Sequence, residues 1–426
     1  MYYKFLVLIF IYTVFGFKLS LLGSANDEKN SSLLGSIRID DIIIVLFLIV
    51  YFLKGRSGGY FLKKKPVALF LLYVSISLFS TIYNSAFGEV DFISSLLFTL
   101  RPLEYCIYIA LGYELGKTKF SPDKTLKFYV VYCLVLIIGQ TLGIIGGVSN
   151  FSFNRAIANT GGPWELAAVS AFLMMYFLLK RNTIFGGASG LILLLTQSRI
   201  TLVGTLITIL FRNLNLITSL LKKKLVLLSF LGLVIVGLSS VAVSLVINEP
   251  DNRSDSNSGV TARFESFGNN DTISTINDIF TNTNAAINRQ DYFNRTYGDG
   301  LNDIITNAGN GDASAFIRFT RWITLIKTAS GNVINFLIGL GPSYAGMAVD
   351  GNYVRMFVET GIIGLFAYII FLVSCLKHIK QKLLKDYIII LVITALFIDI
   401  FVTFKAMFFL WFFYGFYLSR NERDEV

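Results

Sequence analysis

The stretch KKKPVALFLLYVSISLFSTIYN, residues 63–84, carries the two signals that decide the fold. Three lysines precede nineteen residues that include no charge. About twenty apolar residues allow an α-helix to cross the hydrocarbon core of a bilayer, where every backbone amide must be paired within the segment. Lysine clusters beside such a segment favour the cytoplasmic side of the membrane. The stretch therefore predicts a transmembrane helix whose N-terminal end faces the cytoplasm.

The composition of the whole chain agrees with this interpretation. Of the 426 residues, 54% are hydrophobic and only 15% are charged, which is typical of integral membrane proteins. The 3 cysteines cannot supply a disulfide framework or a four-thiolate zinc site. The formal charge of +10 comes from lysines and arginines that flank apolar runs, so it reads as a topology signal, and no nucleic-acid partner is expected.

Further apolar stretches occur along the chain, and together they predict an all-α polytopic membrane protein with about twelve transmembrane helices. The expected spans are residues 2–22, 37–53, 66–84, 92–115, 126–148, 164–180, 183–196, 199–212, 225–247, 352–376, 387–402 and 405–419. Residues 1–247 then contain the first nine helices, residues 248–351 form one large polar loop, and residues 352–426 contain the last three helices and a tail.

Basic residues in alternate loops set the expected orientation. The residues that mark the cytoplasmic loops are Lys54, Arg56, Lys63, Lys64, Lys65, Lys117, Lys119, Lys124, Lys127, Lys180, Arg181, Lys222, Lys223, Lys224, Lys377, Lys380, Lys382 and Lys385. With twelve spans both termini lie inside and the loop 248–351 faces outward. The first span is alternatively a signal peptide, since Gly23 and Ala25 have the spacing of a cleavage site.

The loop 248–351 is rich in Asn, Asp, Ser, Thr and Gly, and it is too long for a simple connector, so a functional role is favoured over a bare solvated loop. Near its end, apolar residues recur at helical spacing: Phe319, Trp322, Ile323 and Ile326. This pattern predicts an amphipathic helix. Arg318 and Arg321 lie three residues apart on its flank, where both guanidinium groups can point the same way.

Charged residues within spans are costly and often mark a site. Arg101 either belongs to a site or forms an intrahelical pair with Glu104. Arg199 ends the polar interruption Thr196–Arg199 between two apolar runs, where it either binds a ligand or reaches lipid phosphate.

Two further places near the C-terminus contain charge. Glu359 lies at the outer start of the tenth span, where it is either functional or a helix-packing residue. Asp399 and Lys405 bracket the last hairpin, and we expect them to form a structural ion pair.

The missing motifs narrow the chemistry. The single histidine, His378, lies in a basic loop assigned to the cytoplasm, so chemistry on the outer face proceeds without imidazole. Nucleophilic triads, phosphate-binding Gly-rich loops and Gly-x-Ser-x-Gly are absent, and no metal or cofactor is expected. The outer face instead carries arginines, which match phosphate oxygens in bidentate geometry: Arg155, Arg199, Arg318 and Arg321, with Arg101 as a further candidate. This set fits a ligand that is part polyprenyl pyrophosphate and part sugar.

The order of motifs resembles the O-antigen polymerase and ligase superfamily. The polar interruption at 196–199 is followed by the large loop, by Arg-Trp at 321–322 and by Ile-Gly-Leu-Gly-Pro at 338–342. Asp-Gly-Asn-Tyr at 350–353 and Glu-Thr-Gly-Ile-Ile-Gly at 359–364 complete the pattern. The resemblance covers about the C-terminal two thirds of the chain.

This resemblance implies a GT-C-type glycosyltransferase of the bacterial inner membrane, with an active site that opens to the periplasm. Such proteins transfer a glycan from undecaprenyl pyrophosphate to a sugar acceptor without nucleotide or metal. Ligases of the family carry a histidine near the end of the loop, where this chain has Asp350–Tyr353, so the resemblance favours a polymerase of O-antigen or capsular repeat units. An O-antigen ligase to the lipid A core is the alternative, and a lipid-linked oligosaccharide flippase or a membrane scaffold are candidates of other classes.

Site residues are assigned on this basis. The expected catalytic residues are Arg199, Arg321 and Arg318 at the pyrophosphate, with Asp350 and Glu359 as candidate proton acceptors. Expected substrate-binding residues are Arg155, Arg101, Ser198, Asn352, Tyr353 and Trp322. The expected partners are undecaprenyl-pyrophosphate-linked oligosaccharide and membrane lipid, with a chain-length regulator as a further candidate.

Overall fold

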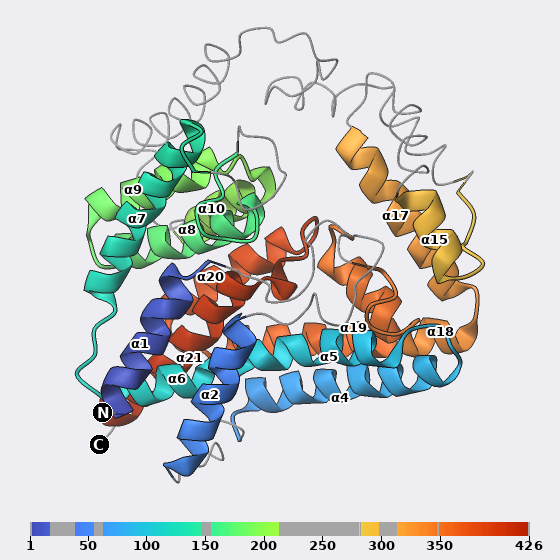
Figure 1. Ribbon diagram of the computed structural model, residues 1–426, viewed down its shortest axis with the longest axis horizontal. Helices are drawn as coiled ribbons and strands as arrows, with labels where there is room; N and C mark the ends of the chain where they lie inside the picture. Colours follow the sequence, from blue (N-terminus) through green and yellow to red (C-terminus); the bar gives the residue numbers. More distant parts are fainter. Residues whose placement is uncertain are drawn as a thin grey trace, which may run out of the picture.

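The computed structural model describes residues 2–17, 39–54, 63–145, 155–212, 281, 283–297, 313–346 and 349–424. All regular structure within these ranges is helical, and no strand occurs in them. Figure 1 shows helices from distant parts of the sequence packed side by side. The expected all-α class is confirmed for this part of the chain.

The first group of helices precedes the large loop. Its members are α1 (Tyr2–Phe15), α2 (Ile39–Leu53), α4 (Lys65–Ala86), α5 (Phe92–Cys106), α6 (Tyr108–Gly116), α7 (Asp123–Thr141), α8 (Pro163–Leu179), α9 (Thr183–Leu195) and α10 (Arg199–Arg212). The second group comprises α15 (Arg289–Thr296), α17 (Ala313–Ser330), α18 (Val333–Ile338), α19 (Asn352–His378), α20 (Lys382–Thr394), the short 3₁₀ helix η3 (Ile400–Val402) and α21 (Phe404–Asp424).

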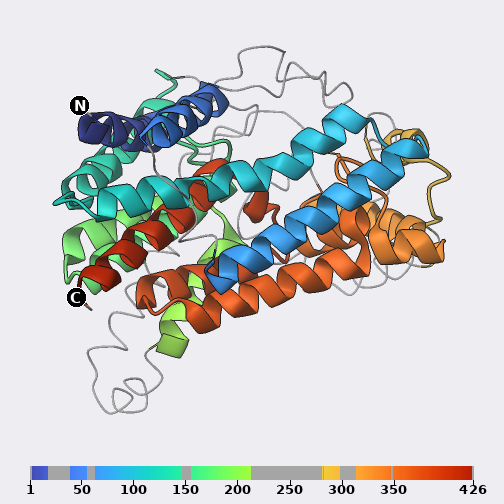
Figure 2. The same cartoon turned by 90° about the horizontal axis from the view of Figure 1, so that it is seen from below.

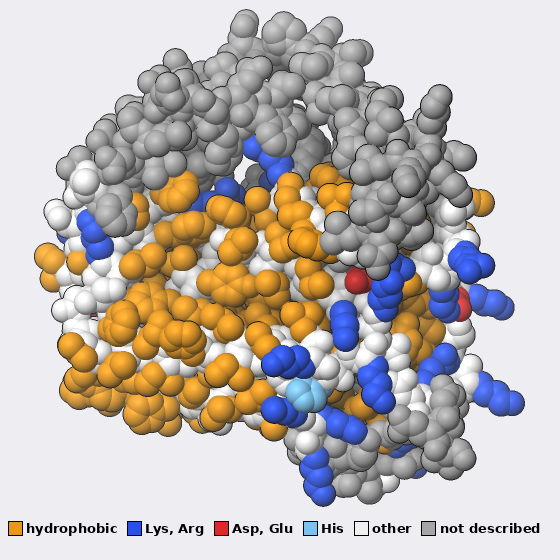
Figure 3. Space-filling model, turned by 180° about the vertical axis from the view of Figure 1, so that it is seen from behind, with side chains coloured by type: hydrophobic (Ala, Val, Ile, Leu, Met, Phe, Trp, Pro, Cys, Tyr) orange, Lys and Arg blue, Asp and Glu red, His pale blue; other side chains and the backbone are white. Residues whose placement is uncertain are grey.

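Two long helices, α4 and α19, form an antiparallel pair along one side of the molecule, with α5 packed against α4 (Figure 2). Both helices bury one stripe and leave apolar side chains exposed on the other, such as Phe79 on α4 and Phe366 on α19. Figure 3 shows a broad continuous apolar surface on this molecule. A large exposed apolar surface indicates contact with lipid rather than with water.

Helices α6 and α21 pack with their backbones in close approach. A Cβ atom added at Gly112 would lie 1.9 Å from the carbonyl oxygen of Phe412, and one at Gly415 would lie 2.1 Å from that of Ile109. Only glycine fits these two positions, as is common where membrane helices meet. Helix α8 is buried on nearly all sides, which explains why it is apolar around its whole circumference.

Four helical stretches of the described residues are long and apolar enough to cross a membrane: Lys65–Ala86, Phe92–Gly116, Asp123–Thr141 and Asn352–His378. This finding supports the prediction of a membrane protein at a coarser level than twelve spans. The other apolar helices near the N-terminal half are shorter, namely Tyr2–Phe15, Asp41–Leu53, Pro163–Leu179 and Thr183–Leu195. The expected span 225–247 lies outside the described residues.

The expected span 92–115 corresponds to α5 and α6, which together form the helical stretch Phe92–Gly116 with a short interruption at Ile107. Two other predicted spans differ from the structure at their boundaries. The expected span 387–402 ends as an α-helix at Thr394 and continues through a turn into η3. The expected span 126–148 begins earlier, at Asp123, and its helix ends at Thr141.

The large polar region contains ordered helices. Its described part includes α15, α17 and α18, and α17 confirms the helix that the spacing of Phe319, Trp322, Ile323 and Ile326 predicts. Tyr292, Leu325, Tyr344 and Val358 belong to a second, smaller apolar core beneath these helices. The described part of the region therefore folds as a cap over one end of the α4 and α19 pair.

Helix α19 is broken at Gly361, where φ is +68°. The break leaves backbone carbonyl groups without partners inside the helix, and they are met from outside. The carbonyl of Val358 accepts a hydrogen bond from Leu340 N at 2.7 Å, and that of Glu359 accepts from Gly341 N at 3.2 Å and from the Ser80 hydroxyl at 2.8 Å. The segment after α18 therefore binds to the backbone at the break. This contact holds the first residues of the loop that connects α18 to α19.

Candidate functional site

The centre of the candidate site is a buried guanidinium group on α19. Arg355 is only 4% exposed, and its Nη1 lies 3.1 Å from Glu359 Oε1, one turn along the same helix. Nη1 also donates to the Gly346 carbonyl at 2.9 Å, while Nη2 lies 2.9 Å from Asp399 Oδ2. Buried charges are tolerated where they are paired and hydrogen-bonded in this way. The three side chains form one ionic cluster, which we call the buried triad (Arg355, Glu359 and Asp399).

Asp399 connects the triad to a loop. Its Oδ2 accepts hydrogen bonds from the backbone N–H groups of Val349 (3.1 Å) and Asp350 (3.2 Å), and its Oδ1 accepts from Gly351 (3.2 Å). Three successive amides around one carboxylate hold the backbone in a fixed curve, and Asp350 has a φ of +58°, which is uncommon for a residue other than glycine. The expected Asp399–Lys405 pair was wrong, because Asp399 pairs with Arg355.

The loop is also held from the other side. Arg289 at the start of α15 donates to the carbonyls of Ser343 (2.8 Å) and Tyr344 (3.3 Å), and Asn84 on α4 donates to the Gly339 carbonyl at 3.1 Å. Burial lowers the pKa of Arg289, an effect that the charge of Glu359 opposes. Burial also raises the pKa of Tyr344, so its phenol stays neutral. We call residues 339–346 and 349–351 the clamped loop.

One ionic pair on the clamped loop stays open to the surroundings. Arg318 Nε on α17 lies 3.2 Å from Asp350 Oδ2, and the two side chains are 32% and 39% exposed. A pair with this exposure can exchange its partner for a ligand at low cost, because each group already contacts solvent. The structure therefore brings together two of the residues assigned from sequence, Arg318 and Asp350, and leaves both accessible.

Arg321 occupies a different environment from the one expected. Its guanidinium carbon lies 3.9 Å from the centroid of the Tyr297 ring, and its Nη2 donates to the Thr296 carbonyl at 3.3 Å. The residue is 7% exposed. Trp322, its neighbour, donates from Nε1 to the Val349 carbonyl at 2.8 Å. Both side chains connect α17 to neighbouring segments, and Arg321 is largely covered by the Tyr297 ring.

Two other assigned residues hold the start of α19 in place. Asn352 accepts a hydrogen bond from Phe401 N at 2.9 Å, and its own backbone N–H donates to the Ala395 carbonyl at 3.0 Å. The Tyr353 hydroxyl donates to the Val392 carbonyl at 3.0 Å. Within the described residues, the buried Asn352 Nδ2 has no hydrogen-bond partner. Asn352 therefore joins the start of α19 to η3 and has an unused side-chain donor, and Tyr353 joins α19 to α20.

A second group of assigned residues lies at the turn before α10. Arg155 Nε donates to the Thr196 carbonyl at 3.1 Å, and the Ser198 hydroxyl lies 2.9 Å from that of Thr201. Thr201 in turn lies 3.5 Å from Thr394 Oγ1 at the end of α20. Because the next residue, Ala395, accepts from Asn352 N, the end of α20 connects this turn to the start of α19.

Arg199 is half-buried as the first residue of α10, and Arg101 is half-buried in the middle of α5. Glu359, the last assigned residue, lies inside the buried triad. The assigned residues thus fall into two groups, one on the clamped loop and one at the 196–199 turn, with α20 between them.

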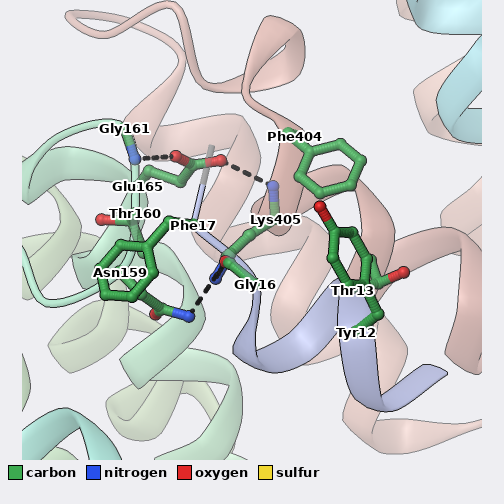
Figure 4. Close-up of a pocket in the computed structure, with 10 residues that line it drawn as sticks. All are labelled: Tyr12, Thr13, Gly16, Phe17, Asn159, Thr160, Gly161, Glu165, Phe404 and Lys405. Carbon is green, nitrogen blue, oxygen red and sulfur yellow. Dashed lines mark hydrogen bonds between the residues drawn. The ribbon is translucent and has the colours of Figure 1, made fainter. Parts of the chain in front are cut away.

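Two further buried charged residues, Glu165 and Lys405, lie elsewhere, at the junction of α1, α8 and α21 (Figure 4). Glu165 accepts hydrogen bonds from Gly161 N (2.7 Å) and Lys405 N (2.6 Å), while Lys405 Nζ donates to the carbonyls of Val14 and Gly16. A cation at the C-terminal end of α1 satisfies carbonyl groups that the helix cannot. The cavity here is about 10 Å³, room for one water at most. This junction is structural.

The most buried charged residue of the site, Arg355, was missed from sequence, as was Arg289. The signal for Arg355 was present, because Arg355 and Glu359 are spaced i, i+4 at the start of an apolar span and such residues face each other on a helix. Asp399 was expected to pair with Lys405 and instead pairs with Arg355. No local pattern joins it to Arg355, because 44 residues separate them.

We compared the chain with known protein families, with curated proteins and with solved structures, and none of the three comparisons found a match. The fold and the site therefore define the class by themselves. The chain is a helical membrane protein with a folded polar cap over a buried ionic triad.

Proposed function

We propose that the protein is a polymerase of O-antigen or capsular oligosaccharide repeat units, which transfers the growing glycan from undecaprenyl pyrophosphate to the next lipid-linked unit. The observation that carries the proposal is the accessible Arg318–Asp350 pair. A fixed guanidinium can neutralise a leaving diphosphate, and a carboxylate beside it can accept a proton. The motif order that resembles this family includes Asp350, and Arg318 lies one helical turn before the Arg-Trp motif at 321–322.

In the proposed reaction, the bond between the anomeric carbon of the donor glycan and the pyrophosphate oxygen breaks, and the electron pair stays on that oxygen. A hydroxyl oxygen of the acceptor sugar forms the new bond to the anomeric carbon. The hydroxyl proton passes to Asp350, which later returns it to solvent. Arg318 stabilises the charge that develops on the leaving group, and no metal or nucleotide takes part.

The buried triad supports this chemistry indirectly. A site on a loop is effective only when the loop is held in place. Asp399 fixes the backbone of Asp350, and Arg355 balances the charge of Asp399. We assign Arg321, Arg355, Glu359 and Asp399 as positioning residues rather than as groups that touch substrate.

The turn at 196–199 is proposed to bind the second lipid-linked substrate. Arg155 and Arg199 are half-buried cations beside the Ser198 hydroxyl. The turn is linked to the clamped loop through the end of α20. A polymerase needs two lipid-linked substrates at once, and two cationic groups on one framework suit that requirement. The twelve-span GT-C arrangement and the periplasmic orientation belong to this proposal.

The test is complementation of a strain that lacks the protein, with surface glycan separated on a gel. Arg318→Ala is expected to lower the rate of chain extension by about 10²–10³, the usual effect of losing one preorganised donor to developing charge. Arg318→Lys keeps the charge but loses the planar fork, so an intermediate loss is expected. The matched control is Arg295→Ala, because Arg295 is an exposed arginine that pairs with Asp291 within α15. Full polymer length from Arg318→Ala at a normal protein level would refute the assignment.

The same strain separates the alternative functions. Loss of a polymerase leaves core that carries a single repeat unit. Loss of a ligase leaves long lipid-linked polymer and bare core. Loss of a flippase traps lipid-linked units inside the cell. Only the first outcome agrees with the proposal.

A further inference from the structure

A cavity of about 250 Å³ lies at the opposite end of the α4 and α19 pair from the buried triad. Its walls come from the first residues of α4, the last residue of α19, the first turn of α20 and the C-terminal part of α21. The lining residues are Lys64, Lys65, Pro66, His378, Ile379, Lys380, Gln381, Leu384, Tyr414, Tyr417, Leu418 and Asn421. A volume of this size holds roughly eight water molecules, which is enough for a phosphate group with part of its hydration.

The cavity has a strongly basic lining. Three lysines and the only histidine of the chain line it, and none of the described lining residues is acidic. Figure 3 shows the histidine surrounded by Lys and Arg side chains. Gln381 Nε2 donates to Asn421 Oδ1 at 2.7 Å across the cavity wall, so α21 and the start of α20 are joined there. A basic lining of this kind favours an anionic ligand.

Two helices begin at this cavity, and neither start is capped by a side chain. Lys64 precedes α4 and Gln381 precedes α20, and neither makes a side-chain capping hydrogen bond. The N–H groups of the first turn and the helix dipole both favour negative charge at such an end. The two helix dipoles and the lysines therefore both favour a negatively charged ligand in the cavity.

The position of the cavity indicates a lipid rather than a soluble anion. Helix α4 has 22 residues and is about 33 Å long, close to the thickness of the hydrocarbon core of a bilayer. It leaves apolar side chains such as Leu72 exposed, and α19 does the same with Ile370 and Val373. The cavity lies where this apolar surface ends, at the depth of lipid headgroups, and Figure 3 shows the basic group beside the apolar face.

We propose that this cavity is a binding site for the phosphate of an anionic phospholipid, held by Lys64, Lys65 and Lys380, with the acyl chains lying along the apolar face of α4 and α19. Tyr414 and Tyr417 also line the cavity, and aromatic rings commonly lie at the depth of lipid headgroups. The site is separate from the proposed transferase site, and its occupancy does not depend on that activity.

The test measures phosphatidylglycerol bound to the purified full-length protein. The protein is titrated with phosphatidylglycerol or phosphatidylcholine in a neutral detergent, and bound lipid is counted by native mass spectrometry. We expect phosphatidylglycerol to bind and phosphatidylcholine not to bind at the same concentration. The double variant Lys65→Gln/Lys380→Gln should bind about 25-fold more weakly, since each lysine near a lipid surface contributes about five-fold.

The matched control is Lys119→Gln/Lys124→Gln, which removes the same charge from two exposed lysines that do not line the cavity. This variant should keep wild-type affinity. Lys65→Arg/Lys380→Arg should also bind, because arginine retains the charge, and this result would show that any loss in the glutamine variant is not a folding defect.

Three results would overturn the proposal. The glutamine variant could bind phosphatidylglycerol as tightly as the wild type does. The Lys119→Gln/Lys124→Gln control could lose as much affinity as the glutamine variant, which would mean that overall charge and not the cavity decides binding. Inorganic phosphate could displace the lipid at an equal concentration, which would make the occupant a soluble anion.

Discussion

The two ends of the α4 and α19 pair both carry basic side chains, and they use them in opposite ways. At the capped end, Arg355 is 4% exposed and contacts two carboxylates and a backbone carbonyl. At the other end, Lys65 and Lys380 are exposed and line an open cavity. A buried charge must have its partners supplied by the protein, whereas an exposed charge also contacts the surroundings, where a ligand can reach it.

The same division is present within the capped end, where buried charges hold the backbone and exposed charges are free to contact a ligand. The buried triad holds the backbone of the clamped loop, and only the pair at its surface, Arg318 and Asp350, is accessible. If the comparison is correct, substitutions in the triad reduce stability, and substitutions at exposed charges reduce binding or turnover. The predictions below test this division.

The largest expected effect is that of Arg355→Ala. The substitution leaves Glu359 and Asp399 as uncompensated buried carboxylates, which typically costs about 3–5 kcal/mol. We expect a large fall in the thermal unfolding temperature of the purified protein and a low yield of folded protein. Thermal unfolding followed by tryptophan fluorescence measures the change.

The control for this prediction is Arg318→Ala, which removes one member of the accessible Arg318–Asp350 pair instead. An exposed ion pair contributes about 0–1 kcal/mol, so the unfolding temperature should stay close to that of the wild type even though turnover falls. Equal destabilisation by the two substitutions would contradict the division between fixing and binding.

The second effect concerns the break in α19, where Gly361→Ala introduces a Cβ atom 2.2 Å from the Leu337 carbonyl oxygen. The position also has a φ of +68° with ψ −173°, a region that only glycine occupies easily, at a cost of about 1–3 kcal/mol for other residues. We expect a loss larger than this strain alone, measured as the shift in unfolding temperature.

The matched control is Gly88→Ala. Gly88 also has a positive φ, +76°, but a Cβ atom there meets nothing within 4 Å. The control therefore reports backbone strain, and the excess loss at Gly361 reports the docking of the segment after α18. If both substitutions lower the unfolding temperature equally, the segment after α18 does not stabilise the break in α19.

Sequence patterns predicted the helices well where hydrophobic periodicity was long. The ranges 66–84 and 352–376 correspond closely to α4 and α19. The break at Gly361 was not predicted, because a glycine inside an apolar run is compatible with a straight helix, and only the carbonyls of Val358 and Glu359 show that another segment enters there.

The candidate site was predicted in part. Arg318 and Asp350 were both assigned, but their contact spans 32 residues and depends on the loop conformation that Asp399 imposes. Arg321 was assigned to the pyrophosphate from its spacing on the helix. That spacing gives a side chain's direction, but it does not show that the Tyr297 ring covers the guanidinium group. Contacts between distant segments, such as Arg355 with Asp399, follow from tertiary packing and leave no local signal.

A third, smaller effect is expected at Asp91, an exposed charge at the capped end. Its carboxylate accepts a hydrogen bond from Ser94 N at 2.8 Å at the start of α5. Loss of such a helix cap typically costs about 1 kcal/mol, so Asp91→Ala should lower the unfolding temperature slightly.

The pH dependence of this effect has a definite sign. The backbone hydrogen bond from Ser94 lowers the pKa of Asp91 below its ordinary value. A carboxyl group with a lowered pKa in the folded state stabilises the fold above its unfolded pKa and loses this contribution as pH falls through the folded pKa. The difference between wild type and Asp91→Ala should therefore be full at pH 7 and shrink below about pH 4. A difference that grows on acidification would contradict the capping role.

The smallest effect on stability is expected at the open end of the pair. Lys65→Gln/Lys380→Gln removes two exposed charges that line the cavity, and surface substitutions of this kind usually change stability by less than about 0.5 kcal/mol each. In lipid-free detergent, the unfolding temperature of this variant should match that of the wild type within error. Added phosphatidylglycerol should then raise the unfolding temperature of the wild type and not that of the variant, because a ligand stabilises only the state that binds it. A large loss of stability without lipid would mean that these lysines fix the fold as Arg355 does, and the contrast between the two ends would fail.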